Sequence, residues 1–214
     1  MGLKELVIGR DHVLIAFDGP VAELADVGSV ADRLRVMVAD GPLPAEVART
    51  DDPMVVLAYA ATIGPATERA LHAQLRRIEY ERVADARTAP GLHDACAAMA
   101  AVGAQITAVS SLAADVARTF LVMHGLQEHV RHVIGPTGAD RSGLPPAPDL
   151  VATAIRERAV PVESCLFVGG TDVDLAAARA AGVETIRHRR RDQAVEPAAA
   201  ADAWFDALAT PAQP

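Results

Sequence analysis

The sequence predicts an α/β fold, a doubly wound parallel sheet into which an all-helical segment is inserted. Short β-branched and apolar runs alternate with alanine-rich stretches of helical periodicity, which is typical of parallel strands joined by crossover helices. The segment 21–88 interrupts this alternation, because it shows helical patterns and no convincing strand. We therefore expect a core domain formed by 1–20 and 89–214 and a helical cap domain formed by 21–88.

Three apolar runs are expected to be buried core strands, namely 13–17, 105–109 and 165–168. Weaker strand candidates are 132–134, 183–186 and 203–205. Helices are expected between them, at 92–101, 113–124, 149–157 and 172–181. Gly125 and Gly182 follow two of these helices at the position that favours a left-handed residue.

The inserted segment contains two strong helix signals. Asp52 and Pro53 form a good N-cap and first-turn pair, and they open an apolar helix that Gly64 ends. A charged helix is then expected over 65–86. Its solvent-facing side chains are expected to be Glu68, Arg76, Arg77, Glu79 and Glu81. A helical insertion after the first strand is expected to cover the carboxyl edge of the sheet, where open α/β sheets bind ligands.

The composition indicates a globular protein and limits its partners. The chain has 214 residues, of which 51% are apolar and 22% charged. Its 28 acidic residues outnumber 20 basic ones and only 3% of residues are aromatic, which argues against nucleic acid. No run approaches the ~20 apolar residues of a membrane span, and the first residues lack the apolar centre of a signal peptide. We expect a cytoplasmic protein without a membrane partner.

The cysteines and most histidines carry no metal pattern. Cys96 and Cys165 lie in apolar segments without a Cys-x-x-Cys motif, so we expect buried, reduced thiols. Six histidines lack metal-ligand spacing and are expected at the surface or at its boundary. They are His12, His72, His93, His124, His129 and His132.

Four motifs follow one another in an order that resembles the haloacid dehalogenase (HAD)-like hydrolase superfamily with a helical C1-type cap. Phe17-Asp18-Gly19-Pro20 follows the first strand, and Ser110 follows the second. Pro145-Pro146-Ala147-Pro148-Asp149 precedes a helix, and the last motif reads VGGTDVDLAAARAAG over 168–182. The resemblance covers nearly the whole chain and implies the HAD-like Rossmannoid core.

The resemblance also implies which groups phosphatase chemistry needs. Phosphatases of this superfamily use a nucleophilic Asp two residues before an acid/base Asp, a hydroxyl that holds phosphate, a Lys, and an acidic pair for Mg²⁺. Asp18, Ser110 and Asp174 match the acid/base, hydroxyl and second metal positions. Ala16 stands at the nucleophile position, Pro145 at the lysine position and Gly170 at the first metal position. The single lysine, Lys4, precedes the first strand.

We therefore expect aspartyl-phosphate chemistry to be lost, no cofactor, and at most weak Mg²⁺ binding through Asp174. The favoured interpretation is a binding or interaction protein whose partner is an anionic small molecule or another protein. The alternative is an enzyme that uses Asp18 in the same cleft for non-covalent acid/base chemistry on a phosphorylated or carboxylated small molecule. Asp11 is a poor substitute nucleophile, because it lies at the far end of the first strand. The oligomeric state stays open.

Each candidate residue also has a structural interpretation. Asp18 could simply form a turn, Ser110 could cap a helix, and Asp172 and Asp174 could complement a helix N-terminus. Three consecutive residues before that helix could instead present amides to an anion, namely Gly169, Gly170 and Thr171. Arg141 could replace the missing lysine charge. The basic run 187–191 reads as a solvated loop that could face a phosphate or an acidic partner.

Overall fold

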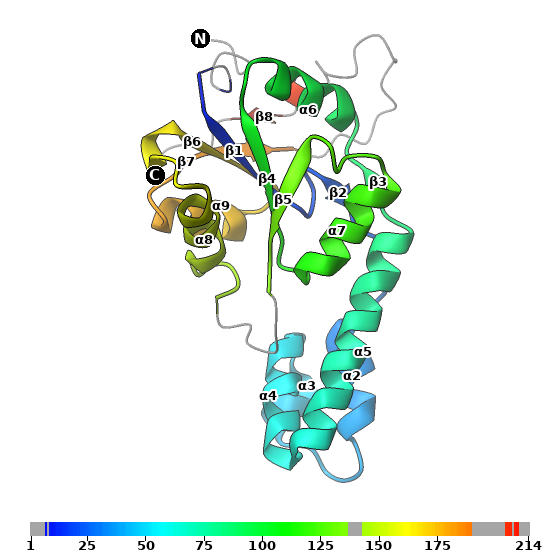
Figure 1. Cartoon of the computed structure of the whole chain (residues 1–214). Helices are drawn as coiled ribbons and strands as arrows, with labels where there is room; N and C mark the ends of the chain where they lie inside the picture. Colours follow the sequence, from blue (N-terminus) through cyan, green and yellow to red (C-terminus); the bar gives the residue numbers. More distant parts are fainter. Residues whose placement is uncertain (1–6, 8, 137–142, 190–203, 207, 210–214) are drawn as a thin grey trace. The chain divides into compact units, whose positions relative to one another are not determined.

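The computed structural model describes residues 7, 9–136, 143–189, 204–206 and 208–209. Within these residues a six-stranded sheet forms the centre of the larger of two compact units (Figure 1). The strands are β1 (His12–Ala16), β4 (Gln105–Val109), β5 (Val130–Ile134), β6 (Cys165–Gly169), β7 (Glu184–His188) and β8 (Leu208–Ala209). Their order is β5-β4-β1-β6-β7-β8. The first five strands of that order are parallel, and β8 is antiparallel to β7. The predicted α/β fold is confirmed.

The central strands form because they are apolar on both faces. All five residues of β1 and all five of β6 are buried, as expected for parallel strands covered by helices on two sides. Leu14, Ala16 and Phe167 pack against helices α8 (Asp149–Arg158) and α9 (Asp172–Ala180). Phe17 meets Phe120 of α7 (Ala114–Met123) edge to face, with ring centroids 5.3 Å apart. Helix α6 (Leu92–Ala101), which precedes β4 in the chain, also belongs to this unit.

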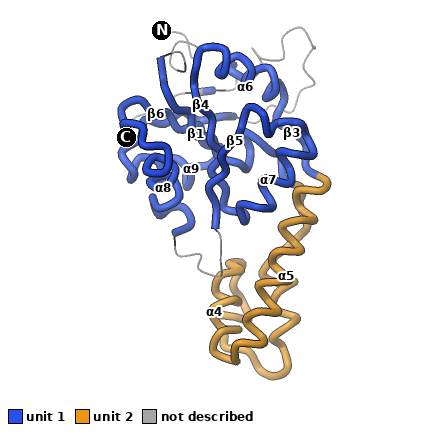
Figure 2. Tube along the Cα trace, viewed as in Figure 1, with its two compact units in different colours: residues 1–24, 86–214 blue, residues 25–85 orange. Residues whose placement is uncertain are grey.

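Residues 25–85 form the second compact unit, which Figure 2 shows in orange. Its helices are α2 (Val30–Arg35), α3 (Ala45–Arg49), α4 (Pro53–Ile63) and α5 (Pro65–Ala84), with a 3₁₀ turn at Val36–Val38. Asp52 caps α4 as predicted, because its Oδ1 accepts a hydrogen bond from the Met54 amide at 2.8 Å. The unit has its own apolar core, which includes Leu34, Leu57, Leu71 and Ile78. The described helices include none that is both long and apolar enough to cross a membrane.

Several local predictions are wrong. Two short strands, β2 (Ala22–Glu23) and β3 (Arg87–Thr88), pair at the two ends of the inserted segment, where no strand was expected. A strand was expected at 203–205, but the described residues 204–206 are helical, and the strand that follows them is β8. Glu79, expected in solvent, is buried, and Arg76 offsets its charge with an ion pair at 3.6 Å.

The two cysteines behave as predicted. Cys96 and Cys165 are both buried and unpaired. Burial raises the pKa of the Cys96 thiol to about 12, and burial is also the main cause that raises the pKa of Cys165. Neither thiol is therefore set up as a nucleophile or a metal ligand.

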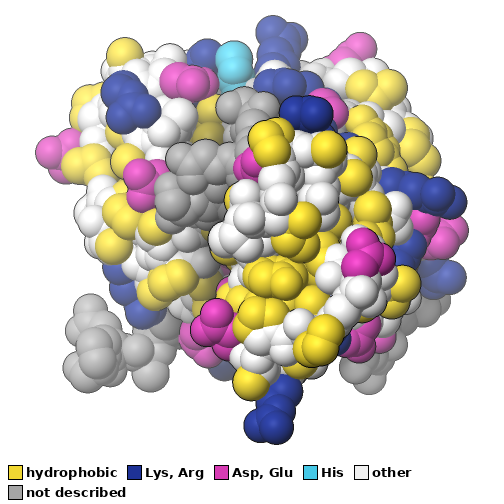
Figure 3. Space-filling model, turned by 90° about the horizontal axis from the view of Figure 1, so that it is seen from below, with side chains coloured by type: hydrophobic (Ala, Val, Ile, Leu, Met, Phe, Trp, Pro, Cys, Tyr) yellow, Lys and Arg dark blue, Asp and Glu magenta, His cyan; other side chains and the backbone are white. Residues whose placement is uncertain are grey.

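Some apolar side chains stay at the surface. Figure 3 shows hydrophobic side chains that reach the exposed face of the molecule. In the helical unit, the large exposed ones are Val36, Met37, Ile63 and Tyr80, which are 78%, 39%, 49% and 38% exposed. Exposed apolar groups of this size are typical of a contact surface when they gather in one patch.

Candidate functional site

Three of the four motifs that the sequence singled out meet at one edge of the sheet. Strand β1 lies between β4 and β6, with Ala16 in register with Val109 and Ile15 with Val168. Because the three strands are parallel, the residues that follow them emerge at the same edge. Asp18, Ser110 and Gly170 therefore come from three adjacent strand ends.

Asp18 lies in a closed turn directly after β1. The Phe17 amide donates to the Val109 carbonyl at 2.8 Å and continues the pairing of β1 with β4. The Ala22 amide then donates to the Phe17 carbonyl, and the Gly19 amide to the Ala22 carbonyl, both at 2.8 Å. Gly19 adopts a φ of 93°, a conformation that favours glycine. The turn leaves Asp18 half-buried beside the end of the strand.

No nucleophilic group extends from the end of β1. Ala16 is only 3% exposed, and its methyl group packs in the apolar core with Val109 and Phe167. The position that the resemblance assigns to an attacking carboxylate is therefore part of the core packing. A methyl group can neither attack phosphorus nor bind a metal.

Gly170 lies under the turn, with little room for a side chain. A Cβ atom on Gly170 would be 3.1 Å from Cδ of Pro20 and 3.6 Å from Cα of Gly19. Gly169 is equally confined, since its Cβ would be 2.8 Å from Leu175 Cδ2 and 3.0 Å from Phe167 Cε1. The two glycines thus let the turn and helix α9 approach the end of β6 closely.

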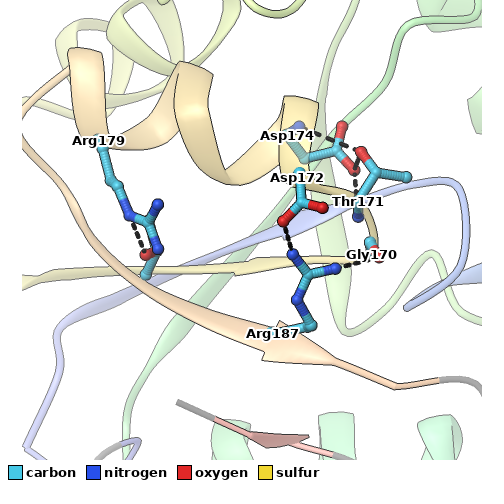
Figure 4. A network of polar contacts seen from close by, with 7 residues as sticks. Gly170, Thr171, Asp172, Asp174, Arg179 and Arg187 are labelled. Atoms are coloured by element: carbon cyan, nitrogen blue, oxygen red, sulfur yellow. Dashed lines mark hydrogen bonds and ion pairs between the residues drawn. The ribbon is translucent and has the colours of Figure 1, made fainter. Parts of the chain in front are cut away.

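Thr171 and Asp174 cap helix α9 reciprocally, as Figure 4 shows. Thr171 Oγ1 accepts from the Asp174 amide at 3.1 Å, and Asp174 Oδ2 accepts from the Thr171 amide at 3.1 Å. The Thr171 hydroxyl also donates to Asp174 Oδ2 at 2.7 Å. This is a capping box, so the structural interpretation of Asp174 accounts for its position.

Arg187 contacts the start of helix α9 and the residue Gly170 before it. Its guanidinium forms an ion pair with Asp172 and donates to the Gly170 carbonyl at 3.5 Å (Figure 4). Arg187 and His188 belong to β7, and His188 is buried, so the run 187–191 is not simply a solvated loop as expected. Arg189 is exposed, and the rest of the run lies outside the described residues.

Ser110 uses its hydroxyl inside the loop that follows β4. Its Oγ accepts a hydrogen bond from the Leu112 amide at 3.0 Å, and the residue is buried. Ser110 does not cap the following helix, because the N-cap of α7 is Ala113. An accepting bond still leaves the hydroxyl hydrogen as a donor.

The donor set at this edge does not fit Mg²⁺. Mg²⁺ requires near-octahedral oxygen ligands and usually one or two carboxylates. Ala16 and Gly170 supply no side-chain oxygen, and Asp174 already accepts two hydrogen bonds from Thr171. Among the described residues, no group of three or more His, Cys, Asp or Glu side chains is arranged to hold a metal ion.

No contact joins the remaining predicted positions to this group among the described residues. Pro145 is half-buried in the loop before α8, and a proline there supplies no charge. Arg141 lies outside the described residues. Asp11 precedes β1 and donates its amide to the Ser164 carbonyl, at the end of the sheet opposite Asp18.

His12 is the exception among the six histidines expected near the surface. It is fully buried at the start of β1, and its Nε2 lies 2.8 Å from Thr107 Oγ1. Burial, with smaller contributions from Arg158 and His132, lowers the pKa of His12 to about 4. The other five are half-buried or exposed, as predicted.

Sequence reasoning missed Trp204 as a neighbour of the motif turn. Its indole Nε1 donates to the Pro20 carbonyl at 3.1 Å, and the side chain is fully buried. The ring also contacts His188, with centroids 5.3 Å apart. A lone tryptophan in a mostly alanine-rich segment was the available signal, but no local pattern connects it to Pro20.

Comparisons with known proteins agree on the family. The model of the haloacid dehalogenase-like hydrolases matches residues 52–188, which is more than half of the chain. No curated protein matches the chain. The structure resembles that of CbbY from Rhodobacter sphaeroides in complex with phosphate, with a TM-score of 0.57, 18% identity, and coverage of 88% of this chain and 91% of that chain.

Two further solved structures share the fold. One is a predicted phosphoglycolate phosphatase from Haemophilus somnus, with a TM-score of 0.57, 16% identity, and 83% and 84% of the two chains covered. The other is a HAD-superfamily hydrolase from Ehrlichia chaffeensis, with a TM-score of 0.52, 11% identity, and 84% and 86% covered. At such identities these structures establish a common fold and not a common substrate. The match of the family model over residues 52–188 shows that the chain belongs to the haloacid dehalogenase-like hydrolase family.

Proposed function

We propose that this protein is a HAD-fold binding protein that has lost aspartyl-phosphate chemistry and that binds an anionic small molecule without a metal. The ligand class is a phosphorylated or carboxylated metabolite held at the edge of the sheet where Asp18, Ser110 and Gly170 meet. The observation that carries the proposal is the buried methyl group of Ala16 at the end of β1. Without a carboxylate at that position, the covalent intermediate of the family cannot form.

Two further groups that the family's phosphatase chemistry needs are also missing from the site. Gly170 lacks the metal carboxylate and lies under the Asp18–Pro20 turn, and Pro145 lacks the lysine charge. Removal of a covalent nucleophile from a cooperative catalytic set costs on the order of 10⁴ to 10⁶ in rate. Three substitutions in separate motifs therefore favour a changed role over a weakened phosphatase.

Binding of an anion is supported by what the site keeps. The structure of CbbY was obtained in complex with phosphate, and this chain shares its fold. The Ser110 hydroxyl hydrogen and the backbone at Gly169 and Gly170 are the polar groups best placed to bind an anion here. The Thr171 amide is already satisfied by Asp174, and the carboxylates of Asp172 and Asp174 oppose a second negative charge. We therefore expect micromolar to millimolar affinity.

Thermal unfolding with phosphorylated and carboxylated ligands, each with and without EDTA, tests the proposal. A ligand at 100 times its dissociation constant adds about 2.7 kcal/mol to the stability of the folded state. We expect stabilisation that EDTA does not alter and that Ser110→Ala weakens. The exposed Ser29→Ala, at the N-cap of α2 in the other unit, is the matched control.

Other outcomes would redirect the assignment. Turnover of a stabilising ligand would support the enzymatic alternative with Asp18 as acid/base. If no anion stabilises the protein, or if Ser110→Ala leaves the shift intact, an interaction role becomes the better proposal. The exposed apolar side chains of the helical unit, among them Val36 and Ile63, are then the first surface to examine.

A further inference from the structure

The turn that carries Asp18 is held from two sides. On one side Gly170 lies against it, so closely that a Cβ atom there would be 3.1 Å from the Pro20 ring. On the other side Trp204 donates its indole hydrogen to the Pro20 carbonyl at 3.1 Å. Trp204 follows Pro20 by 184 positions, so this contact joins two distant parts of the chain.

The hydrogen bond between Trp204 and the Pro20 carbonyl is buried, so its loss would destabilise the turn. Trp204, Pro20 and Val21 are all buried. The neighbouring carbonyls of Phe17, Val21 and Ala22 accept backbone amides, whereas the Pro20 carbonyl accepts from Trp204. A buried carbonyl that loses its donor is costly, because it cannot bind water in compensation. The indole N–H therefore stabilises the present position of the turn.

Trp204 is itself fixed by the carboxyl end of β7. Its ring packs on His188 of β7 and edge to face on Phe205, at centroid distances of 5.3 and 5.6 Å. Two residues beyond Asp206, strand β8 pairs with β7, with Leu208 in register with His188. The described residues 204–206 and 208–209 thus dock on β7 and on the turn together. We call them the C-terminal clamp.

We propose that Trp204 is a positioning residue: docking of the C-terminal clamp and the conformation of the Phe17–Ala22 turn form one local equilibrium, which sets the position of Asp18. The inference deepens the proposed function, because it names what controls the geometry of that site. It depends on no ligand, so its test is separate from the test of anion binding. Opening of the clamp releases the Pro20 carbonyl, and the turn loses its buried partner.

Amide hydrogen exchange of Trp204→Phe tests the coupling. Phenylalanine keeps an aromatic ring beside His188 but lacks the N–H donor. We expect exchange at the Gly19 and Ala22 amides, which close the turn, to increase about ten- to hundredfold, as loss of one buried hydrogen bond predicts. Exchange in β4 is expected to change by less than threefold, roughly the factor that corresponds to 0.6 kcal/mol.

The matched control is His188→Phe. It keeps an aromatic ring beside Trp204 and removes no hydrogen bond to the turn, so Gly19 and Ala22 are expected to keep their exchange rates. The proposal is wrong if His188→Phe increases amide exchange in the turn as much as Trp204→Phe does. It is also wrong if Trp204→Phe increases the exchange of all amides equally, because that result indicates a loss of global stability. An unchanged exchange rate at every amide of Trp204→Phe would contradict the proposal as well.

The wild-type protein gives a second test that does not require the variant to fold. Trp204 is the single tryptophan of the chain, so its indole N–H produces one resonance in a ¹⁵N-labelled sample. Each observed exchange rate is divided by the intrinsic rate of its own N–H group to give an opening equilibrium constant. We expect this indole and the Ala22 amide to share one opening constant and one dependence on urea, with a constant at least tenfold larger than that of the β4 amides. Different opening constants for the two groups, or exchange of both only with β4, would overturn a separate clamp.

Discussion

Gly170 and Asp18 approach each other so closely that a Cβ atom on Gly170 would lie 2.8 Å from the Asp18 carbonyl oxygen. Real Cβ atoms do not approach a backbone oxygen to this distance, so one of the two segments would have to move. The glycine at the first metal position therefore has a structural consequence besides the loss of a carboxylate. It lets the turn after β1 close over the end of β6.

Substitution of Gly170 is expected to destabilise the protein. Gly170→Ala forces the Asp18–Pro20 turn to shift, and overpacking of this kind typically costs about 1–3 kcal/mol. Urea unfolding of Gly170→Ala measures the loss. Gly41→Ala is the matched control, because a Cβ atom there meets nothing within 4 Å, and its stability should change little. If both variants are as stable as the wild-type protein, the turn can shift without loss of stability, and the expectation for Gly170→Ala is wrong.

Phosphatase activity toward generic phosphate esters is expected to stay at background, with or without Mg²⁺. Ala16→Asp alone should not restore it, because the new carboxylate would lack the metal and the lysine. The triple variant Ala16→Asp, Pro145→Lys, Gly170→Asp should also fail in this fold, since position 170 has no room beside the Asp18 carbonyl. Robust Mg²⁺-dependent turnover by the wild-type protein would contradict the proposed function.

Asp174 is expected to act as a helix cap and not as a strong metal ligand. Calorimetry with millimolar Mg²⁺ should show little heat. Asp174→Ala removes the acceptor of the Thr171 amide and should lower stability by about 0.5–2 kcal/mol, the usual range for a lost cap. Thr171→Ala should cost a similar amount, because it removes the other half of the capping box. A Mg²⁺ site tighter than about 100 μM that Asp174→Asn abolishes would show that metal binding survives.

Acidification is expected to destabilise the protein between pH 7 and pH 4. Burial is the main cause that lowers the pKa of His12 and of His188 from 6.5 to about 4. The unfolded chain therefore binds more protons than the folded chain in this window, so the free energy of unfolding falls as the pH falls. One pKa unit corresponds to about 1.4 kcal/mol, so the two histidines together account for a loss of several kcal/mol.

Urea unfolding at a series of pH values measures this slope. The phenylalanine ring of His188→Phe cannot accept a proton. The substitution also breaks no hydrogen bond of His188 Nε2, because this atom is buried without a hydrogen-bond partner among the described residues. The variant should therefore remove roughly half of the pH dependence between pH 6.5 and pH 4. The exposed His93→Gln is the control and should keep the full slope. A wild-type slope in His188→Phe would mean that His188 is protonated as readily in the folded chain as in the unfolded one.

The sequence by itself determined the parallel core and the family. The segments 105–109 and 92–101 became a strand and a helix with the predicted bounds, because apolar runs and helical periodicity act over neighbouring residues. Ala16, Asp18, Ser110 and Gly170 also lie at one edge of the sheet. Parallel strands bring the residues that follow them together, so their order along the chain was sufficient.

Only the tertiary structure decided how those residues are used. A two-residue strand such as β2 has no periodicity to detect, and it forms because β3, far along the chain, pairs with it. The burial of His12, Glu79 and His188 depends on which elements cover them, and a polar residue shows no local sign of that. The roles of Gly170 and Trp204 come from contacts with Asp18 and Pro20 across most of the chain length. Local sequence propensity cannot predict such contacts, because they form only when the sheet has brought β1, β6 and β7 together.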